Sequence, residues 1–352
     1  MGALGRKVKS SKAKNLGPIH DVAVTSIEVA KHAGVSQSTV ARVFARPELV
    51  SVATRQEVFR VAESLGYLPS AIAAGMRNQR SGLIGVVVPS FGEYWQGVIS
   101  EFSRQINNGS RQLLLTTFRD AEGVEGAIRS ISRYRLDGLV LASSTIGVGQ
   151  ISRLINSSMS VVAFNQPDAA NIAPQVVVDN QQGATDIAMH LLECGVKSVA
   201  FVGGIAQAST DKLRYRGAVE AFSAQGISCP YIQAGGFNYD AGFKIGAMAA
   251  VSNQLPDAFM VAADEIAFGV LDGLRKRGVR VPDDVLVTGF DGVPQSFWEG
   301  YDLTTLVQPI ELMVTGALKL LVEKSSADSA DSVIVEGELR IGNTTKVRNN
   351  HG

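Results

Sequence analysis

From Gly82 to Asp291, short β-branched runs alternate with stretches of helical periodicity. The runs include GLIGVVVP, LDGLVLASS, VKSVAFVGG and DVLVTGFD, and each is long enough for one strand. Continuous apolar runs separated by helices predict parallel sheets that are covered on both faces. The runs are too many for one sheet, so we expect two doubly wound lobes. Ligands of such folds bind beyond the carboxyl ends of the strands, which places a site in the cleft between the lobes.

A pair of short helices precedes this region, in SIEVAKHAGVSQSTVARVF. Thr25 and Glu28 have the T-x-x-E spacing of a capping box at the start of the first helix. Gly34 can close that helix in a left-handed conformation, and Ser36 can cap the second helix. Two helices joined by a short turn that contains glycine form the helix-turn-helix pattern. An ordinary antiparallel helix pair in a small α domain remains the alternative interpretation.

The sequence after this pair predicts a third helix and then a linker. Ser51 can cap the third helix and Gly66 can end it, which gives a small three-helix headpiece over residues 24–68. Residues 69–81, PSAIAAGMRNQRS, are small and weakly apolar. Gly75 weakens any helix there, and so short a helix needs a partner to form. We therefore interpret residues 69–81 as a hinge helix or linker.

Charge is distributed unevenly along a chain that is neutral overall. Residues 1–80 hold 12 Lys and Arg against 5 Asp and Glu, while residues 81–352 hold 21 against 28. A basic front on an acidic body suits a headpiece that is attracted to a polyanion. We predict that residues 1–23 are a basic, disordered tail, which either adds phosphate attraction or is simply solvated.

Several classes of protein are disfavoured by the same sequence. No apolar run reaches the ~18 residues of a membrane helix, and no signal peptide is visible, so we expect a cytoplasmic protein with no membrane partner. The two cysteines, Cys194 and Cys229, lack metal spacing and are expected to be reduced thiols. The four histidines are scattered, so we predict no metal site and no cofactor.

Motifs for catalysis are also missing from the sequence. It contains no Walker loop, no G-x-S-x-G elbow and no H-E-x-x-H, so we predict no catalytic residues and no enzyme. Aspartates end three predicted strands, at Asp179, Asp264 and Asp291. Such residues can bind hydroxyls or amines of a ligand, or simply cap the next helix. Without a nearby nucleophile or metal cluster, binding is favoured over catalysis.

The order of headpiece, hinge and two-lobed body resembles the LacI/GalR family of bacterial transcriptional regulators. The resemblance extends from Val24 to about Thr345 and rests on phrases in the expected order: VTSIEVAKHAGVSQSTVARVF, IGVVVP, VVVDNQQGA, VAFVGG, AADEIAFG, VPDDVLVTGFD and LTTLVQP. It implies a helix-turn-helix headpiece and a body of the two-lobed α/β periplasmic-binding-protein (type I) fold, residues 82–352. It places the N-lobe at about 82–178 and 308–323, and the C-lobe at about 179–307 and 324–345. The three crossings between lobes then fall near Val178, Gln308 and Glu323.

The resemblance also implies which residues contact DNA. Its recognition-helix positions are Gln37 and Ser38 for bases, Arg42 for a base or a phosphate, and Ser36 and Thr39 for the backbone. Gln and Arg are side chains that read base edges bidentately in a major groove. In the hinge, Met76 stands where the family inserts Leu into the minor groove, and Ser70 replaces the usual Asn. The predicted DNA-binding set is Thr25, Ser36, Gln37, Ser38, Thr39, Arg42, Ser70 and Met76.

In the cleft, the resemblance implies an effector site. Arg214 corresponds to the family's ligand-gripping Arg, Asp264 to its ligand-binding Asp and Phe237 to a stacking aromatic. The complete predicted set is Tyr94, Trp95, Asn165, Arg214, Phe237 and Asp264. Aromatic faces with Asp, Asn and Arg suit a sugar, Arg permits a sugar acid, and a nucleobase stays possible.

These residues together predict a repressor whose operator affinity is controlled by a small metabolite. The implied partners are a pseudo-palindromic DNA duplex, a small-molecule effector and a second copy of the chain. The C-terminal RIGNTTKVRNNHG has no leucine heptads, so we predict a homodimer and not a tetramer. The alternative, a solute-binding protein of a sugar transporter, requires an export signal and no helix-turn-helix.

Overall fold

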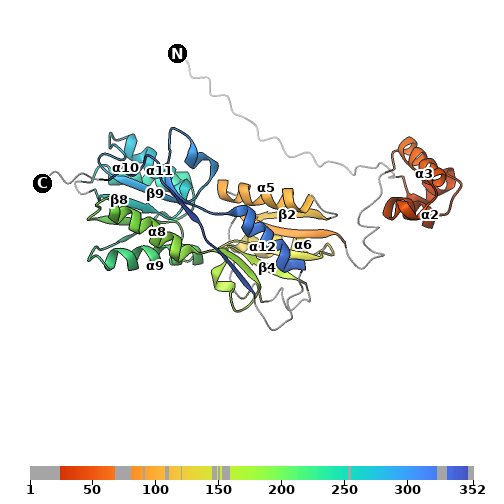
Figure 1. The fold of residues 1–352 in the computed structure, drawn as a ribbon, viewed down its shortest axis with the longest axis horizontal. Coiled ribbons are helices and arrows are strands. Elements are labelled where there is room, and N and C mark those ends of the chain that lie inside the picture. The colour runs from red at the N-terminus through yellow and green to blue at the C-terminus, as the bar shows by residue number, and fades with distance from the viewer. Residues whose placement is uncertain are drawn as a thin grey trace, which may run out of the picture. The chain divides into compact units, whose positions relative to one another are not determined.

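The computed structural model describes two compact units, one within residues 1–79 and one within residues 80–352 (Figure 1). The described residues are 24–67, 81–89, 92–107, 111–119, 121–144, 149, 151–152, 159–252, 255–322 and 331–347. The predicted tail lies outside them, as does the hinge apart from residue 81. We call the two units the headpiece and the body.

The described part of the headpiece, residues 24–67, is a bundle of three α-helices with one 3-10 turn. Its elements are α1 (Ser26–His32), α2 (Gln37–Ala45), η1 (Pro47–Leu49) and α3 (Val52–Leu65). Thr25 and Glu28 form the predicted capping box at the start of α1. Gly34 and Gly66 have positive φ angles of 65° and 66° at the two turns where the chain leaves a helix, a conformation that glycine adopts without steric cost.

Small aliphatic side chains fill the interior of the headpiece. Val29, Val40, Val43 and Val58 are fully buried and pack together. Ile27, which helical spacing would also place on the apolar face of α1, is instead 62% exposed. Burial of four valines from all three helices therefore fixes the orientation of α2 against α1 and α3.

The body contains the remaining helices and strands, in the alternating order that the sequence predicts. The N-lobe elements are β1 (Leu83–Pro89), α5 (Glu93–Asn107), β2 (Gln112–Phe118), α6 (Ala121–Ile131), β3 (Gly138–Ala142), β4 (Val161–Phe164), η2 (Pro167–Ala169), β5 (Gln175–Val178), α12 (Ile310–Val322) and β11 (Ser332–Val335). The C-lobe elements are α8 (Asn180–Glu193), β6 (Val199–Gly203), α9 (Ser209–Ser223), β7 (Tyr231–Gln233), α10 (Tyr239–Ala249), β8 (Ala258–Val261), α11 (Asp264–Arg275), β9 (Leu286–Asp291), η3 (Pro294–Phe297), β10 (Thr304–Val307) and β12 (Glu338–Arg340).

Two six-stranded sheets form the centres of the lobes. Their strand orders are β11-β5-β4-β3-β1-β2 and β12-β10-β9-β8-β6-β7, and every pair is parallel except β10 with β12. The chain passes between the lobes from β5 to α8, from β10 to α12 and from β11 to β12. The last passage corrects our boundary near Glu323, because β11 still pairs with β5 of the N-lobe and the chain crosses at Glu336 and Gly337. No sequence pattern marks SVIV as a strand of one lobe or the other, since that depends on which sheet edge is open.

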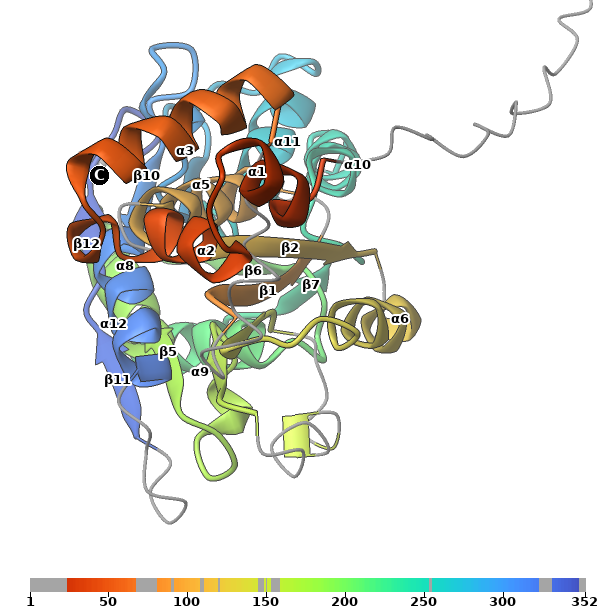
Figure 2. The same ribbon diagram turned by 90° about the vertical axis from the view of Figure 1, so that its right-hand side faces the viewer.

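Both faces of the N-lobe sheet are buried. Ile84, Val86 and Val88 of β1 share one apolar cluster with Phe102 of α5, while Val87 belongs to a second cluster with residues of α6. Successive side chains of a strand point to opposite faces, so β1 contributes to both clusters in turn. In Figure 2, α12 and α6 accordingly lie on opposite sides of the N-lobe strands.

In the C-lobe, α8 and α9 cover one face of the sheet, and α10 and α11 cover the other (Figure 1). The α10–α11 pair is unusually close because both helices carry two glycines at a four-residue spacing. A Cβ at Gly246 would stand 2.2 Å from the Val270 carbonyl oxygen, and one at Gly269 would stand 2.1 Å from the Tyr239 carbonyl oxygen. Hydrogen at these positions therefore allows the two backbones to touch.

We expect Gly269→Ala to destabilise the body, because the added methyl group would force α10 and α11 apart at a cost of about 1–3 kcal/mol. Denaturant unfolding of the full chain would measure the change. The matched control is Gly126→Ala in α6, where an added Cβ meets nothing within 4 Å. That variant should be stabilised by up to ~1 kcal/mol, since alanine favours a helix over glycine. Equal behaviour of the two variants would contradict close glycine packing.

Candidate DNA-binding surface and effector cleft

Helix α2 presents a polar, exposed surface on the headpiece. Ser36, Gln37, Ser38 and Arg42 are exposed, whereas Val40 and Val43 face the core. The side chains that could read base edges therefore share the solvent side of one helix. An α-helix fits the major groove of B-DNA, so this side of α2 is suited to enter one.

Hydrogen bonds at the start of α2 fix its first turn. Ser36 accepts a hydrogen bond from the Thr39 amide at 3.1 Å, and its hydroxyl also pairs with those of Ser38 and Thr39. The side-chain amide of Gln37 donates through Nε2 to the Ser26 hydroxyl of α1 at 3.0 Å. The polar residues of the turn are thus held in place by their own contacts, which limits the entropy lost when a duplex orders them.

The body has a cleft between its lobes at the carboxyl ends of the strands. It has a volume of about 480 Å³, which includes space open to solvent. The lining residues come from the N-terminus of α5, the ends of β3, β4 and β9, helix α9 and the segments that lead into α10 and α11. They are Gly92, Tyr94, Trp95, Ser144, Asn165, Thr210, Arg214, Phe237, Ala263, Glu265 and Asp291.

A buried hydrogen-bond network crosses the floor of the cleft. Arg214 lies 3.3 Å from Asp291, and Gln308 donates to the same Asp291 oxygen at 2.7 Å. The Tyr94 hydroxyl donates to Gln308 at 3.0 Å. The network therefore joins α9 and β9 of the C-lobe to α5 of the N-lobe through the second crossing.

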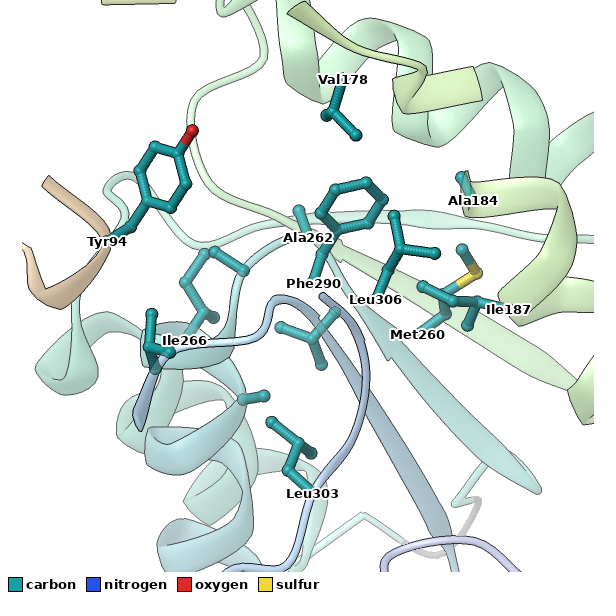
Figure 3. Packing of buried hydrophobic residues seen from close by; sticks show 14 of the residues in the cluster. Tyr94, Val178, Ala184, Ile187, Met260, Ala262, Ile266, Phe290, Leu303 and Leu306 are labelled. Carbon is teal, nitrogen blue, oxygen red and sulfur yellow. The ribbon is translucent and has the colours of Figure 1, made fainter. Parts of the chain in front are cut away.

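Several groups of the protein hold Arg214 in place. Its Nε donates to Asn180 at 2.8 Å, one terminal nitrogen donates to the Ala262 carbonyl at 2.5 Å, and its guanidinium lies 3.7 Å from the Phe290 ring centroid. Figure 3 shows Phe290 among Val178, Leu306 and other apolar side chains of the core. The arginine therefore rests on the hydrophobic core, and much of its donor capacity is already used.

The two acidic residues at the start of α11 point in different directions. Asp264 is fully buried and accepts hydrogen bonds from the Thr305 hydroxyl at 2.6 Å and the Val293 amide at 3.0 Å. Gly289 makes this possible, because a Cβ there would stand 2.2 Å from the Asp264 carboxylate. Glu265, the next residue, lines the cleft.

Burial raises the pKa of all three acids around the cleft. Burial and the nearby Asp291 raise the pKa of Asp264. The pKa of Asp291 is also raised by burial, against the opposing effect of Arg214. Burial raises the pKa of Glu265 to about 7. One guanidinium thus faces more acidic groups than it can neutralise.

Asn165 offers the cleft an acceptor that the protein does not use. Its side chain is 4% exposed, and its Oδ1 atom has no hydrogen-bond partner among the described residues. Its φ angle is 57°, in the left-handed region that Asn tolerates better than most residues. A buried polar atom without a partner costs free energy that a ligand donor could recover.

Two family models match the chain. The model described as bacterial regulatory proteins of the lacI family matches residues 27–70. A periplasmic binding protein-like domain matches residues 188–345. The chain carries a LacI-family DNA-binding domain and a periplasmic-binding-protein-like domain. It is therefore a DNA-binding bacterial regulatory protein, as its sequence predicts.

Curated LacI-family relatives match nearly the whole chain. The catabolite control protein A of Priestia megaterium is 28% identical over 90% of this chain and 97% of its own length. A ribose operon repressor of Halalkalibacterium halodurans is 27% identical over 91% and 96%. The transcriptional repressor PurR of Pasteurella multocida is 26% identical over 91% and 98%.

Solved LacI-family structures have the same fold. A Lac repressor dimer bound to operator and the anti-inducer ONPF has a TM-score of 0.81 at 22% identity, covering 92% of this chain and 99% of that one. A complex of the regulator CelR with cellobiose has a TM-score of 0.66 at 25% identity, covering 91% and 99%. These matches confirm the predicted two-part fold.

The structure brings most of the predicted effector residues together. Tyr94, Trp95, Asn165, Arg214 and Phe237 line the cleft, whereas Asp264 lies beneath it. Of the predicted DNA-binding residues, those from Thr25 to Arg42 lie at the N-terminus of α1 or on α2 and its cap. Ser70 and Met76 fall outside the described residues.

Six lining residues are absent from the predicted effector set, and four of them, Ser144, Thr210, Glu265 and Asp291, are polar. Thr210 precedes Arg214 by one helical turn on α9, a spacing that could have revealed it. Asp291 was recognised as a strand-end aspartate that could bind a ligand or cap a helix, but it was not included in the predicted set. Ser144 and Glu265 follow β3 and β8, and only the three-dimensional arrangement shows that they face the cleft.

The described part of the chain holds no cluster of three or more His, Cys, Asp or Glu residues that could bind a metal. Among the same residues, no helix combines the length and hydropathy needed to cross a bilayer.

We expect Arg214→Met to reduce the free energy of unfolding by about 3 kcal/mol, because it leaves Asp291 buried without its cation. Loss of the cation raises the pKa of Asp291 further. An acid with a raised folded-state pKa contributes stability that is lost as pH rises through that pKa. Denaturant unfolding should therefore show a larger loss of unfolding free energy, relative to the unmodified protein, at pH 8 than at pH 5.5. Arg280→Met, which breaks an exposed pair with Asp284, should leave the free energy of unfolding nearly unchanged at either pH, because solvent screens exposed pairs.

Proposed function

We propose that the protein is a transcriptional repressor that binds its operator as a homodimer and releases or holds it according to a small ligand in the cleft. The single observation that carries the ligand part is the cleft itself, in which aromatic side chains and the unsatisfied acceptor of Asn165 converge between two lobes. The relatives named above as repressors support the regulatory part.

The chemistry of the cleft favours a neutral, hydroxyl-rich ring as the ligand. Phe237 and Trp95 offer aromatic faces to the CH side of a sugar, while Asn165 offers an unused acceptor. Glu265 and Asp291 add further acceptors, and Arg214 is largely occupied by protein partners. A sugar acid would bring its carboxylate against these acids, so we favour a sugar over a sugar acid. The cellobiose complex of CelR is a precedent in a similar fold.

A homodimer follows from the two-fold symmetry of a pseudo-palindromic operator. The body also exposes large apolar side chains, including Phe297 and Trp298 at 48% and 58%. Exposed aromatic residues of this kind are enriched at protein interfaces. We further propose that the protein acts on DNA in the cytoplasm and catalyses no reaction.

Arg42→Ala should weaken binding to a duplex selected from a random library by about 1–3 kcal/mol, as expected for loss of one base contact. Fluorescence anisotropy over a range of salt concentrations would measure it. The matched control is Arg60→Ala on α3, which removes an equal charge from an arginine already paired with Glu57. Equal losses in both variants would show that only net charge matters and would refute recognition by α2.

For the ligand, a thermal-shift screen of the full chain should compare each neutral sugar with its matching acid, for example glucose with gluconate. A ligand that binds only the folded state raises the midpoint of unfolding. We expect a shift with neutral sugars, and Thr210→Val should reduce it by removing one hydroxyl from the lining. A shift with the acids alone would contradict the proposed ligand class.

A further inference from the structure

Glu265 connects the two lobes directly at the mouth of the cleft. Its side chain belongs to the first turn of α11 in the C-lobe. Its Oε1 atom accepts a hydrogen bond from the backbone amide of Glu93, the first residue of α5 in the N-lobe. The first amides of a helix lack partners within that helix and carry partial positive charge. A side-chain carboxyl oxygen of one lobe thus caps a helix of the other.

The backbone of the N-lobe leaves room for this contact at Gly92. A Cβ at Gly92 would stand 2.9 Å from Glu265 Oε1 and 3.5 Å from Cδ1 of Trp95. The φ angle of Gly92 is 109°, which side chains other than hydrogen rarely permit. Glu265, Gly92 and the cleft aromatic Trp95 therefore meet at one point.

We propose that Glu265 is an inter-lobe latch, whose side-chain carboxyl group accepts the hydrogen bond from the start of α5 when the cleft is closed and leaves α5 when it opens. Closure then draws Tyr94 and Trp95, both in the first turn of α5, toward the ligand space. The latch rests on the cleft of the proposed function but does not need its ligand. A measurement can therefore contradict the latch without contradicting ligand binding, and the reverse.

The surroundings of Glu265 make the latch dependent on pH. Asp291 and Glu93 are the acidic groups that act on it, and Arg214 is engaged with Asp291. Burial is the largest cause that raises the pKa of Glu265 to about 7, from 4.5. In an open cleft the side chain is hydrated and regains its ordinary pKa. Closure therefore takes up a proton, and the closed form is favoured below pH 7 and loses that advantage as pH rises through 7.

Trp95 provides a readout that requires no ligand. We expect its emission in the full-length protein to shift to longer wavelength as pH rises through about 7, because opening exposes the indole to water. Glu265→Gln keeps an acceptor for the Glu93 amide but cannot ionise, so its emission should stay at the closed position throughout. Trp95→Phe should remove the signal, which assigns it to this residue and not to Trp298.

Gly92→Ala tests the geometry without changing any charge. The added methyl group should displace Glu265, so that emission stays at the long-wavelength position at every pH. Gly97→Ala in α5 is the matched control, since a Cβ there would stand 3.4 Å from the Ile310 side chain and away from the latch. It should behave like the unmodified protein.

The proposal is overturned if Glu265→Gln titrates like the unmodified protein, which would assign the transition to Asp291. It is equally overturned if Gly92→Ala and Gly97→Ala give the same emission. Either result would leave ligand binding in the cleft untouched, because the thermal-shift screen tests that separately.

Discussion

The buried pairing of Arg214 with Asp291 is the contact on which the arrangement of the body depends. Asp291 ends β9, and Gln308, which bonds to the same carboxylate, stands where the chain passes from β10 to α12. Asn180, which accepts from Arg214, stands where the chain passes from β5 to α8. One charged group thus ties two of the three passages between lobes to the floor of the cleft.

Such a network has little intrinsic stabilising value. Removing two charges from water costs several kcal/mol per ion, and the attraction between them roughly offsets that cost. The raised pKa values of Asp264 and Asp291 reflect that balance. The network instead gives the two lobes a defined relation, and it places polar groups where the strands of both sheets end. Regulation requires such groups, because a ligand shifts an equilibrium only through contacts that differ between its two states.

The headpiece and the body both present polar residues on an apolar scaffold, but the scaffolds are built differently. In the headpiece, four buried valines and short caps hold α2 with its polar side outward. In the body, apolar strands buried on both faces hold a cleft whose lining is polar. A rigid apolar scaffold in each unit leaves the exposed polar residues free to act on DNA or on a ligand.

Much of this protein could be predicted from its sequence because periodicity and capping are local properties. The capping box at Thr25, the turn at Gly34 and the alternation from Gly82 onward each depend on neighbouring residues only, and they were enough to indicate both units. Family resemblance added Arg214, Asn165 and the cleft aromatics. The direction in which a side chain points within one turn is not local. Asp264 and Glu265 are adjacent, yet Gly289 of a distant strand admits the first into the interior, and α5 of the other lobe receives the second. The lobe to which β11 belongs was likewise decided only by which sheet had an unpaired edge beside β5.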